Sequence, residues 1–167
     1  MEDKERVFAT NRSARHLYEI LENYEAGIVL SGFEVKSIRE GKVQIKDSYA
    51  GFEKGELFLY NCHISPYSHH THATLTPIDP LRKRKLLMHK LELRRLKGKS
   101  EEKGLTIIPL RFYQKGRKIK VEISLCKGKK VFDKRESIKK REIERENATI
   151  LKYKLTKIQL KMFFLAD

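Results

Sequence analysis

The chain has 167 residues, enough for one hydrophobic core and an appendage, since domains commonly contain about 100–150 residues. It carries 37 Lys and Arg against 22 Asp and Glu, a formal net charge of +15, which attracts a nucleic acid or an anionic membrane surface. The longest apolar run, residues 162–166, is too short to cross a bilayer, and no signal-peptide pattern follows Met1, so we expect a cytoplasmic protein.

The first quarter of the chain predicts two helices separated by a strand. Apolar residues recur at spacings of three and four between positions 14 and 24, which indicates an amphipathic helix capped at Asn11 or Ser13 and ending near Gly27. Residues 27–30 are typical of a short buried strand. Residues 33–40 then predict a short helix that Gly41 stops.

The middle of the chain predicts two β-hairpins. An alternating stretch over residues 43–49, a glycine-bearing turn over 51–55 and a strand over 57–60 form the first. Residues 63–80, with three prolines and a histidine cluster, predict a loop, and residues 86–96 a strand that enters a helix. Residues 106–113 and 118–125, joined at Lys115-Gly116, form the second hairpin.

These elements predict a mainly β fold with helices (α+β), in which antiparallel strands close or nearly close into a small barrel over residues 1–126. Residues 127–167 differ in character: they hold 13 Lys and Arg and six Asp and Glu, a net charge of +7. Between positions 133 and 147 the only apolar side chains are Ile138 and Ile143. We expect this basic tail to be disordered in free solution and to fold on a partner.

The basic residues are clustered in a way that suits RNA. One cluster covers residues 82–85 and continues to residue 99, and a second covers residues 127–135. Phosphate backbones favour such density, and exposed aromatic side chains of the predicted β core could stack on bases: Tyr60, Tyr67, Phe112 and Tyr113. A solvated helix face is the alternative for the first cluster alone, and core packing is the alternative for each aromatic ring.

Nothing in the sequence favours an enzyme. His69, His70 and His72 suggest a metal site or an RNA hydrolase, but no carboxylate or thiolate ligand stands at a suitable spacing. Cys62 and Cys126 are isolated, so we expect them reduced and packed. We therefore predict no catalytic residue, no metal and no cofactor.

Several segments are more specific, and they are, in order, N-R-S-A-R-H at 11–16, Y-E-A-G-I at 24–28, G-F-E-V-K-S-I-R at 32–39, D-S-Y at 47–49, D-P-L-R-K-R-K-L-L at 79–87, K-G-K-K at 127–130 and D-K-R at 133–135. Over residues 11–146 the chain closely resembles the small protein B family, the bacterial tmRNA-binding (SsrA-binding) proteins. The resemblance implies an OB-like antiparallel β-barrel with about three helices. It also implies trans-translation: the barrel binds the tRNA-like domain of tmRNA and, with elongation factor Tu, delivers it to stalled ribosomes.

The resemblance also implies which residues make contact. RNA-binding positions would be Asn11, Arg12, Arg15, Glu25, Lys36, Arg82, Arg84, Lys85, Leu87 and Lys120. The tail would occupy the decoding centre and the empty mRNA channel of the ribosome, facing small-subunit rRNA through Lys129, Lys130, Phe132, Asp133, Lys134 and Arg135. Phe132 departs from the His or Tyr that family members tend to carry there, which keeps stacking and removes a hydrogen bond.

The end of the tail departs further, because after Glu146 apolar residues return at helical spacing. We expect a helix that forms on the ribosome, and a membrane-surface helix is the alternative. The alternative for the whole protein is a ribosomal protein or a general RNA chaperone, which would share the basic barrel without preferring one RNA.

Overall fold

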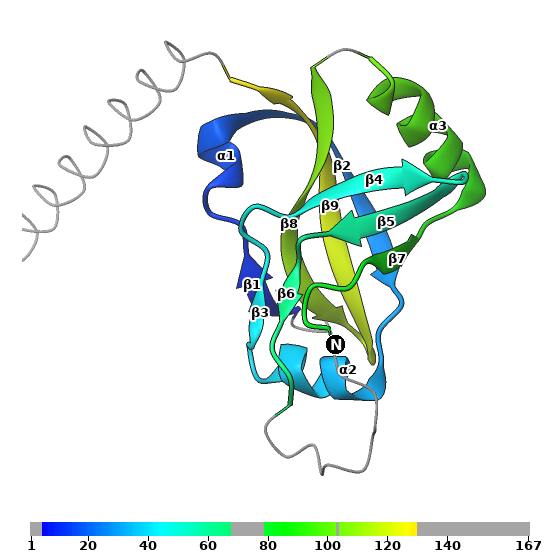
Figure 1. Cartoon of the computed structure of the whole chain (residues 1–167). Helices are drawn as coiled ribbons and strands as arrows, with labels where there is room; N and C mark the ends of the chain where they lie inside the picture. The colour runs from blue at the N-terminus through cyan, green and yellow to red at the C-terminus, as the bar shows by residue number, and fades with distance from the viewer. Residues whose placement is uncertain (1–4, 68–78, 103, 130–167) are drawn as a thin grey trace, which may run out of the picture. The chain divides into compact units, whose positions relative to one another are not determined.

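The computed structural model describes residues 5–67, 79–102 and 104–129, and within them it has three helices and nine strands (Figure 1). The chain divides into two units, residues 1–128 and residues 129–167, and all the described elements belong to the first.

Six strands pair into a closed ring. In order around the ring they are β8 (Leu105–Lys115), β4 (Tyr49–Glu53), β5 (Glu56–Tyr60), β7 (Arg84–Leu87), β2 (Tyr18–Ile28) and β9 (Lys118–Gly128), and β9 also pairs with β8. Strand β1 (Arg6–Thr10) adds to β8, while β3 (Val43–Gln44) and β6 (His63–Ile64) form a separate pair. Every pairing is antiparallel, which confirms the predicted mainly β class with about three helices.

Both predicted hairpins exist, and the first is shorter than expected. Strands β8 and β9 turn at Gly116, whose φ of 58° suits glycine, with Lys115 opposite Lys118. Strands β4 and β5 turn at Lys54 and Gly55. The prediction of one strand over residues 43–49 is wrong, because the backbone takes a positive φ of 63° at Asp47 and residues 43–44 pair with β6 instead.

The helix predicted over residues 14–24 is the main error. Only Ala14–Leu17 is helical (α1), and β2 follows at once, absorbing the start of the strand predicted over 27–30. Along β2 exposed and partly buried side chains alternate, ending at the fully buried Ala26, while Leu21 is 45% exposed. Pairing with β9 from Tyr18 to Gly27 satisfies the backbone over nearly the whole strand, so tertiary pairing overrides a local helical spacing.

The other two helices agree with the sequence. Helix α2 (Gly32–Arg39) begins with a capping box, in which the Glu34 carboxylate accepts from the Ser31 backbone N–H at 2.8 Å, and Gly41 with φ 76° follows its end. Helix α3 (Lys90–Ser100) follows directly after β7, as the predicted strand-to-helix segment requires.

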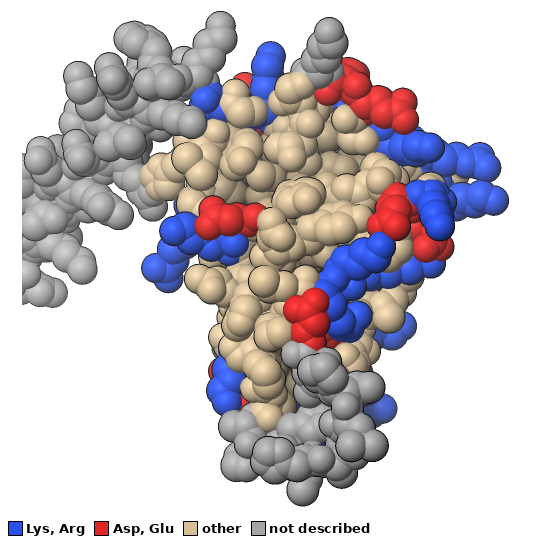
Figure 2. All heavy atoms as spheres, viewed as in Figure 1, with Lys and Arg blue, Asp and Glu red and all other residues tan. Residues whose placement is uncertain are grey.

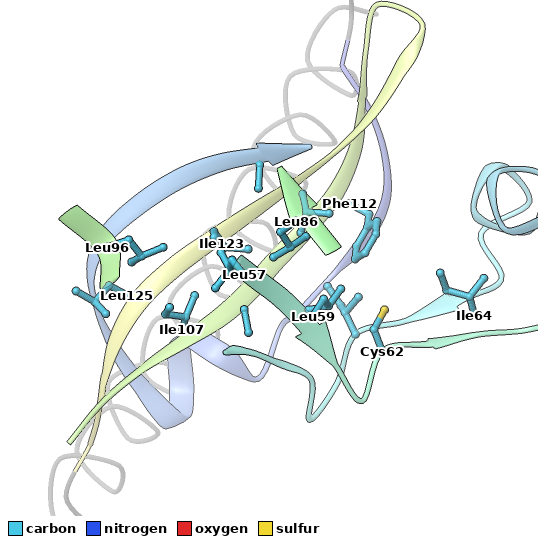
Figure 3. Packing of buried hydrophobic residues seen from close by; sticks show 14 of the residues in the cluster. Leu57, Leu59, Cys62, Ile64, Leu86, Leu96, Ile107, Phe112, Ile123 and Leu125 are labelled. Carbon is cyan, nitrogen blue, oxygen red and sulfur yellow. The ribbon is translucent and has the colours of Figure 1, made fainter. Parts of the chain in front are cut away.

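The core fills the inside of the ring, where inward side chains from β5, β7, β8 and β9 meet (Figure 3). Each fully buried aliphatic side chain contributes roughly 1.5–3 kcal/mol to folding. Helices α2 and α3 contribute Ile38 and Leu96, and Leu96 lies at the same end of the cluster as Leu125. Cys62 and Cys126 are free and buried, and burial raises the pKa of the Cys62 thiol to about 12.

Candidate RNA-binding site

Three of the predicted contact residues, Glu25, Leu87 and Lys120, come from three different strands and meet at one place. They are brought together by strand register, because Gly27 of β2 lies opposite Leu87 of β7 on one side and opposite Lys120 of β9 on the other. A Cβ atom at Gly27 would lie 3.4 Å from the Leu87 Cβ, so glycine lets the strand pass closely under Leu87.

Glu25 is the charged centre of this place. Its carboxylate accepts hydrogen bonds from the Tyr113 hydroxyl at 2.6 Å and from the Lys115 ammonium at 2.9 Å, and it lies 3.4 Å from the Lys120 ammonium. The Tyr113 hydrogen bond, followed by those from the two lysines, lowers the pKa of Glu25 to about 2. Glu25 therefore stays ionised near neutral pH and holds two ammonium groups on one side of the sheet.

Leu87 is exposed at the centre of a hollow surface. Its side chain is 49% exposed, while its neighbour Leu86 points into the core and is 2% exposed, as strand alternation requires. Two adjoining hollows, of about 450 Å³ and 530 Å³, share Leu87 and Lys120, and we call them together the Leu87 groove. The remaining lining residues are Glu25, Gly27, Ile28, Leu30, Val35, Met88, His89, Glu92, Lys115, Arg117, Lys118 and Ile119.

The groove combines an apolar floor with a basic rim. Leu30, Val35 and Ile119 line one of its hollows, and Lys118 and Arg117 line the same hollow. An unstacked base can pack on the apolar part while the cations meet phosphates, which is the usual way that unpaired RNA is held. The side chains of the groove can therefore bind a base and its neighbouring phosphates together.

Asn11 lies apart from the groove and is buried, with 7% exposure. Its amide nitrogen donates to the backbone carbonyls of Pro109 at 3.2 Å and Ile45 at 3.4 Å, and its side-chain oxygen accepts from the Ala14 N–H at 3.1 Å. Both ends of the amide are thus used to hold the turn that leads into α1, and the exposed Arg12 and Arg15 lie in this turn and in α1 respectively.

Arg84 requires a correction, because it is fully buried rather than available to RNA. Its guanidinium donates to Glu34 at 2.8 Å and to the backbone carbonyls of Cys62 and Pro80 at 2.6 and 2.9 Å. The partly exposed Arg82 donates to the same Glu34 carboxylate at 2.9 Å. The structure therefore gives Arg84 a structural role, which ties β7 to α2.

Burial raises the pKa of Glu34, but the hydrogen bonds that it accepts from Arg82, Ser31 and Arg84 outweigh burial and lower the pKa to about 2. Glu34 is only 1% exposed, so an ionised carboxylate is stable here because two guanidinium groups and a helix N-terminus face it.

The other predicted cations lie on the surface. Lys85 forms an exposed ion pair with Glu56, and the Lys36 ammonium lies 5.3 Å from the centre of the Tyr67 ring. Of the aromatic residues suggested for stacking, Tyr60 already stacks on Tyr49 with ring centres 5.3 Å apart. Phe112 and Tyr113 are buried, so core packing is the correct interpretation for them.

Some predictions concern residues outside the described part of the chain. Among the predicted ribosome-facing residues only Lys129 is described, and Lys130, Phe132, Asp133, Lys134 and Arg135 fall beyond it. So do His69, His70 and His72. Within residues 5–67, 79–102 and 104–129, no group of three or more His, Cys, Asp or Glu side chains could hold a metal ion, and no helix is long and apolar enough to span a membrane.

The residues of the site that the sequence did not indicate include Tyr113 as a partner of Glu25, and Lys115, Arg117 and Lys118 around the β8–β9 turn. The signal was present in the hairpin itself, since its tight turn places the cations of both strands at one end of the ribbon. Without the register of β2 against β9, nothing connected that end to Glu25.

The ring of antiparallel strands and its basic groove define a small β-rich protein built to bind nucleic acid. The chain belongs to the SmpB family: the family model described as SmpB protein matches residues 8–153.

Curated relatives are more than half identical to the chain over the aligned residues. A protein named SsrA-binding protein from Syntrophobacter fumaroxidans is 54% identical over 144 residues, which cover 86% of this chain and 88% of the relative. Proteins of the same name from Carboxydothermus hydrogenoformans and Aquifex aeolicus are each 56% identical, over 142 and 149 residues. These matches cover 85% and 86% of this chain and 93% of each relative.

A solved structure titled "tmRNA-SmpB: a journey to the center of the bacterial ribosome" contains a similar chain. It is 56% identical, with a TM-score of 0.60, and the match covers 74% of this chain and 85% of that one. The similarity extends the family assignment from sequence to fold.

Proposed function

We propose that this protein is the tmRNA-binding factor of trans-translation, which binds the tRNA-like domain of tmRNA and brings it to stalled ribosomes. The names of its relatives and the ribosome complex of its structural neighbour support this function. The observation in the structure that carries it is the meeting of Glu25, Leu87 and Lys120 in one exposed basic groove. Such a role requires binding and no catalytic residue.

Each group of the groove has a separate part in the proposed contact. The exposed Leu87 packs against a base or ribose, and Lys115 and Lys120 meet phosphates. Glu25 fixes the positions of the two ammonium groups and can accept a hydrogen bond from a ribose hydroxyl. Arg12, Arg15, Lys36, Arg82 and Lys85 are further contacts, and Asn11 acts by holding the loop before α1.

The basic tail acts on the ribosome in this proposal. Residues 127–167 carry a net charge of +7 and face small-subunit rRNA at the decoding centre and in the empty mRNA channel, through Lys129, Lys130, Phe132, Asp133, Lys134 and Arg135. From its sequence alone, we propose that this tail folds into a helix only on the ribosome. Elongation factor Tu takes part in delivery, and the whole process runs in the cytoplasm.

The experiment is a reconstituted translation reaction on a message without a stop codon, with purified tmRNA. Adding the protein should produce tagged, released peptide in proportion to its concentration, and omitting either the protein or tmRNA should abolish tagging. Peptide that stays bound to the ribosome with all components present would contradict the proposal. A general RNA chaperone or ribosomal protein, the alternative that the relatives' names do not favour, would give that negative result.

A further inference from the structure

Helix α3 carries three cations that neither the fold nor the Leu87 groove accounts for. Lys90, Arg94 and Lys97 follow one another at spacings of four and three residues, so they form one row along the helix, and all three are exposed. At 1.5 Å per residue the row extends over about 10 Å. We call it the α3 stripe.

The α3 stripe has no partner within the described part of the chain. None of its side chains lies in an ion pair there, whereas the neighbouring Lys99 pairs with Glu22. Figure 2 shows Lys and Arg side chains gathered at the right of the molecule, where α3 lies, with acidic side chains at the top and beside the lower part of this group. The row is therefore a local surplus of positive charge.

Helix stability does not explain the row. Lys90 is the first residue of α3, where the positive end of the helix dipole disfavours a cation, and the N-cap His89 makes no side-chain capping bond. Leu96 is the only buried residue of the helix. Leu91, beside the row, is 78% exposed, so the described part of the chain leaves this apolar side chain largely uncovered as well.

The position of α3 indicates what the stripe meets. The helix begins three residues after Leu87, and its Glu92 and the preceding His89 line the same hollow as Leu87 and Lys120. The row itself lies roughly 140–160° around the helix from Glu92, so an RNA backbone held in the groove reaches it by passing around the first turn of α3. Resting on the proposed function, we infer that the α3 stripe binds the sugar-phosphate backbone of the same RNA, as a second contact beyond the groove.

The test compares three variants of the full-length protein with wild type by equilibrium binding to the tRNA-like domain over a series of salt concentrations. The first is Lys90→Gln, Arg94→Gln and Lys97→Gln. The control, Arg39→Gln, Lys42→Gln and Lys46→Gln, removes the same formal charge from the end of α2 and the residues around β3, none of which lines the Leu87 groove or belongs to α3 (Figure 1). Each lost phosphate contact should reduce the slope of log K against log salt by about 0.7–0.9.

We expect the α3 variant to lose about 2–3 in slope and roughly tenfold or more in affinity, with an unchanged melting temperature, and the control to lose little. A charge-preserving variant, Lys90→Arg, Arg94→Lys and Lys97→Arg, should bind like wild type. Equal slopes of log K against log salt for the α3 variant and the control would overturn the inference. The same holds if the α3 variant loses only ribosome binding. If wild-type protein does not prefer the tRNA-like domain, the proposed function itself fails, which separates the two outcomes.

Discussion

At the scale of single residues, charge has two different uses in this protein. The Glu34 carboxylate is buried between two guanidinium groups and ties β7 to α2. The Glu25 side chain is 37% exposed, and its carboxylate positions two lysines at the surface. The motif R-K-R-K at 82–85 looked like a uniform basic patch in the sequence. Strand alternation and one buried acid divide it, so that Arg84 points inward and Lys85 outward, and no sequence signal marks Glu34 as the acid that Arg84 needs.

Replacing Glu34 should therefore damage the fold. Glu34→Gln leaves the Arg84 guanidinium buried without its counter-charge, and we expect a loss of about 3–5 kcal/mol in the free energy of unfolding at pH 7, measured by denaturant titration. The matched control Glu56→Gln breaks the exposed pair with Lys85 and should cost less than about 1 kcal/mol. Equal losses from the two substitutions would contradict the assigned role of Arg84.

The pH dependence of folding gives a second test of Glu34. Its pKa is about 2 in the folded protein against an ordinary value of 4.5, so its contribution is complete above pH 4.5 and is lost as the pH falls toward 2. The wild-type free energy of unfolding should decline over this window, and that of Glu34→Gln should decline less. Parallel declines would show that Glu34 is not the group responsible.

Glu25 should govern which RNA is bound more than how tightly any RNA is bound. Glu25→Gln frees Lys115 and Lys120 and removes a negative charge, so binding to an unrelated RNA hairpin should strengthen while binding to the tRNA-like domain should weaken. We expect the ratio of the two affinities to fall about tenfold, equal to about 1.4 kcal/mol. A ratio that stays at the wild-type value would show that the carboxylate does not position the lysines for this RNA.

At the scale of elements, the sequence predicted the hairpins and helices that have strong local signals. The prediction failed where pairing between distant strands decides the secondary structure. Helix α2 has a capping box and a stopping glycine, and the β8–β9 ribbon has long alternating runs, so both were predictable. Strand β2 shows a helical spacing of apolar residues, and only its pairing with β9 makes it a strand. The groove was predictable by resemblance in three of its residues, while the lysines of the turn depended on that same pairing.

Strand β7 offers a direct comparison between a folding side chain and a binding side chain in adjacent positions. Leu86→Ala removes a core contact and should cost about 2–5 kcal/mol in the free energy of unfolding. Leu87→Ala should leave stability within about 0.5 kcal/mol and reduce affinity for the tRNA-like domain about tenfold. Denaturant titration and equilibrium RNA binding measure the two quantities. An affinity unaffected by Leu87→Ala would contradict the assignment of the Leu87 groove as the RNA-binding site.

At the scale of the whole molecule, the net charge of +15 is distributed between two parts: +7 lies on residues 127–167 and the remaining +8 on residues 1–126. Charge alone left membranes and many RNAs open as partners, and the proposed function assigns a separate task to each part. In our proposal the β-ring binds tmRNA and the tail binds the ribosome.

That division predicts separable defects. Lys134→Ala with Arg135→Ala should leave affinity for the tRNA-like domain within about twofold and abolish tagging in the reconstituted reaction, because both side chains face the ribosome in the proposal. A charge-matched control in the same tail, Lys139→Ala with Lys140→Ala, tells whether position or charge alone matters. A large loss of RNA affinity in the Lys134→Ala, Arg135→Ala variant would show that the proposed boundary between RNA binding and ribosome binding is wrong.

The central claim is that the Leu87 groove recognises one particular RNA. Competition binding at fixed salt, between the tRNA-like domain of tmRNA and an unrelated hairpin of equal length, tests it most directly. The account predicts that the tRNA-like domain is preferred by a factor of about 1,000 or more, the usual margin of specific over non-specific nucleic-acid binding. Comparable affinities for the two RNAs would contradict it, since the groove would then be only a basic surface.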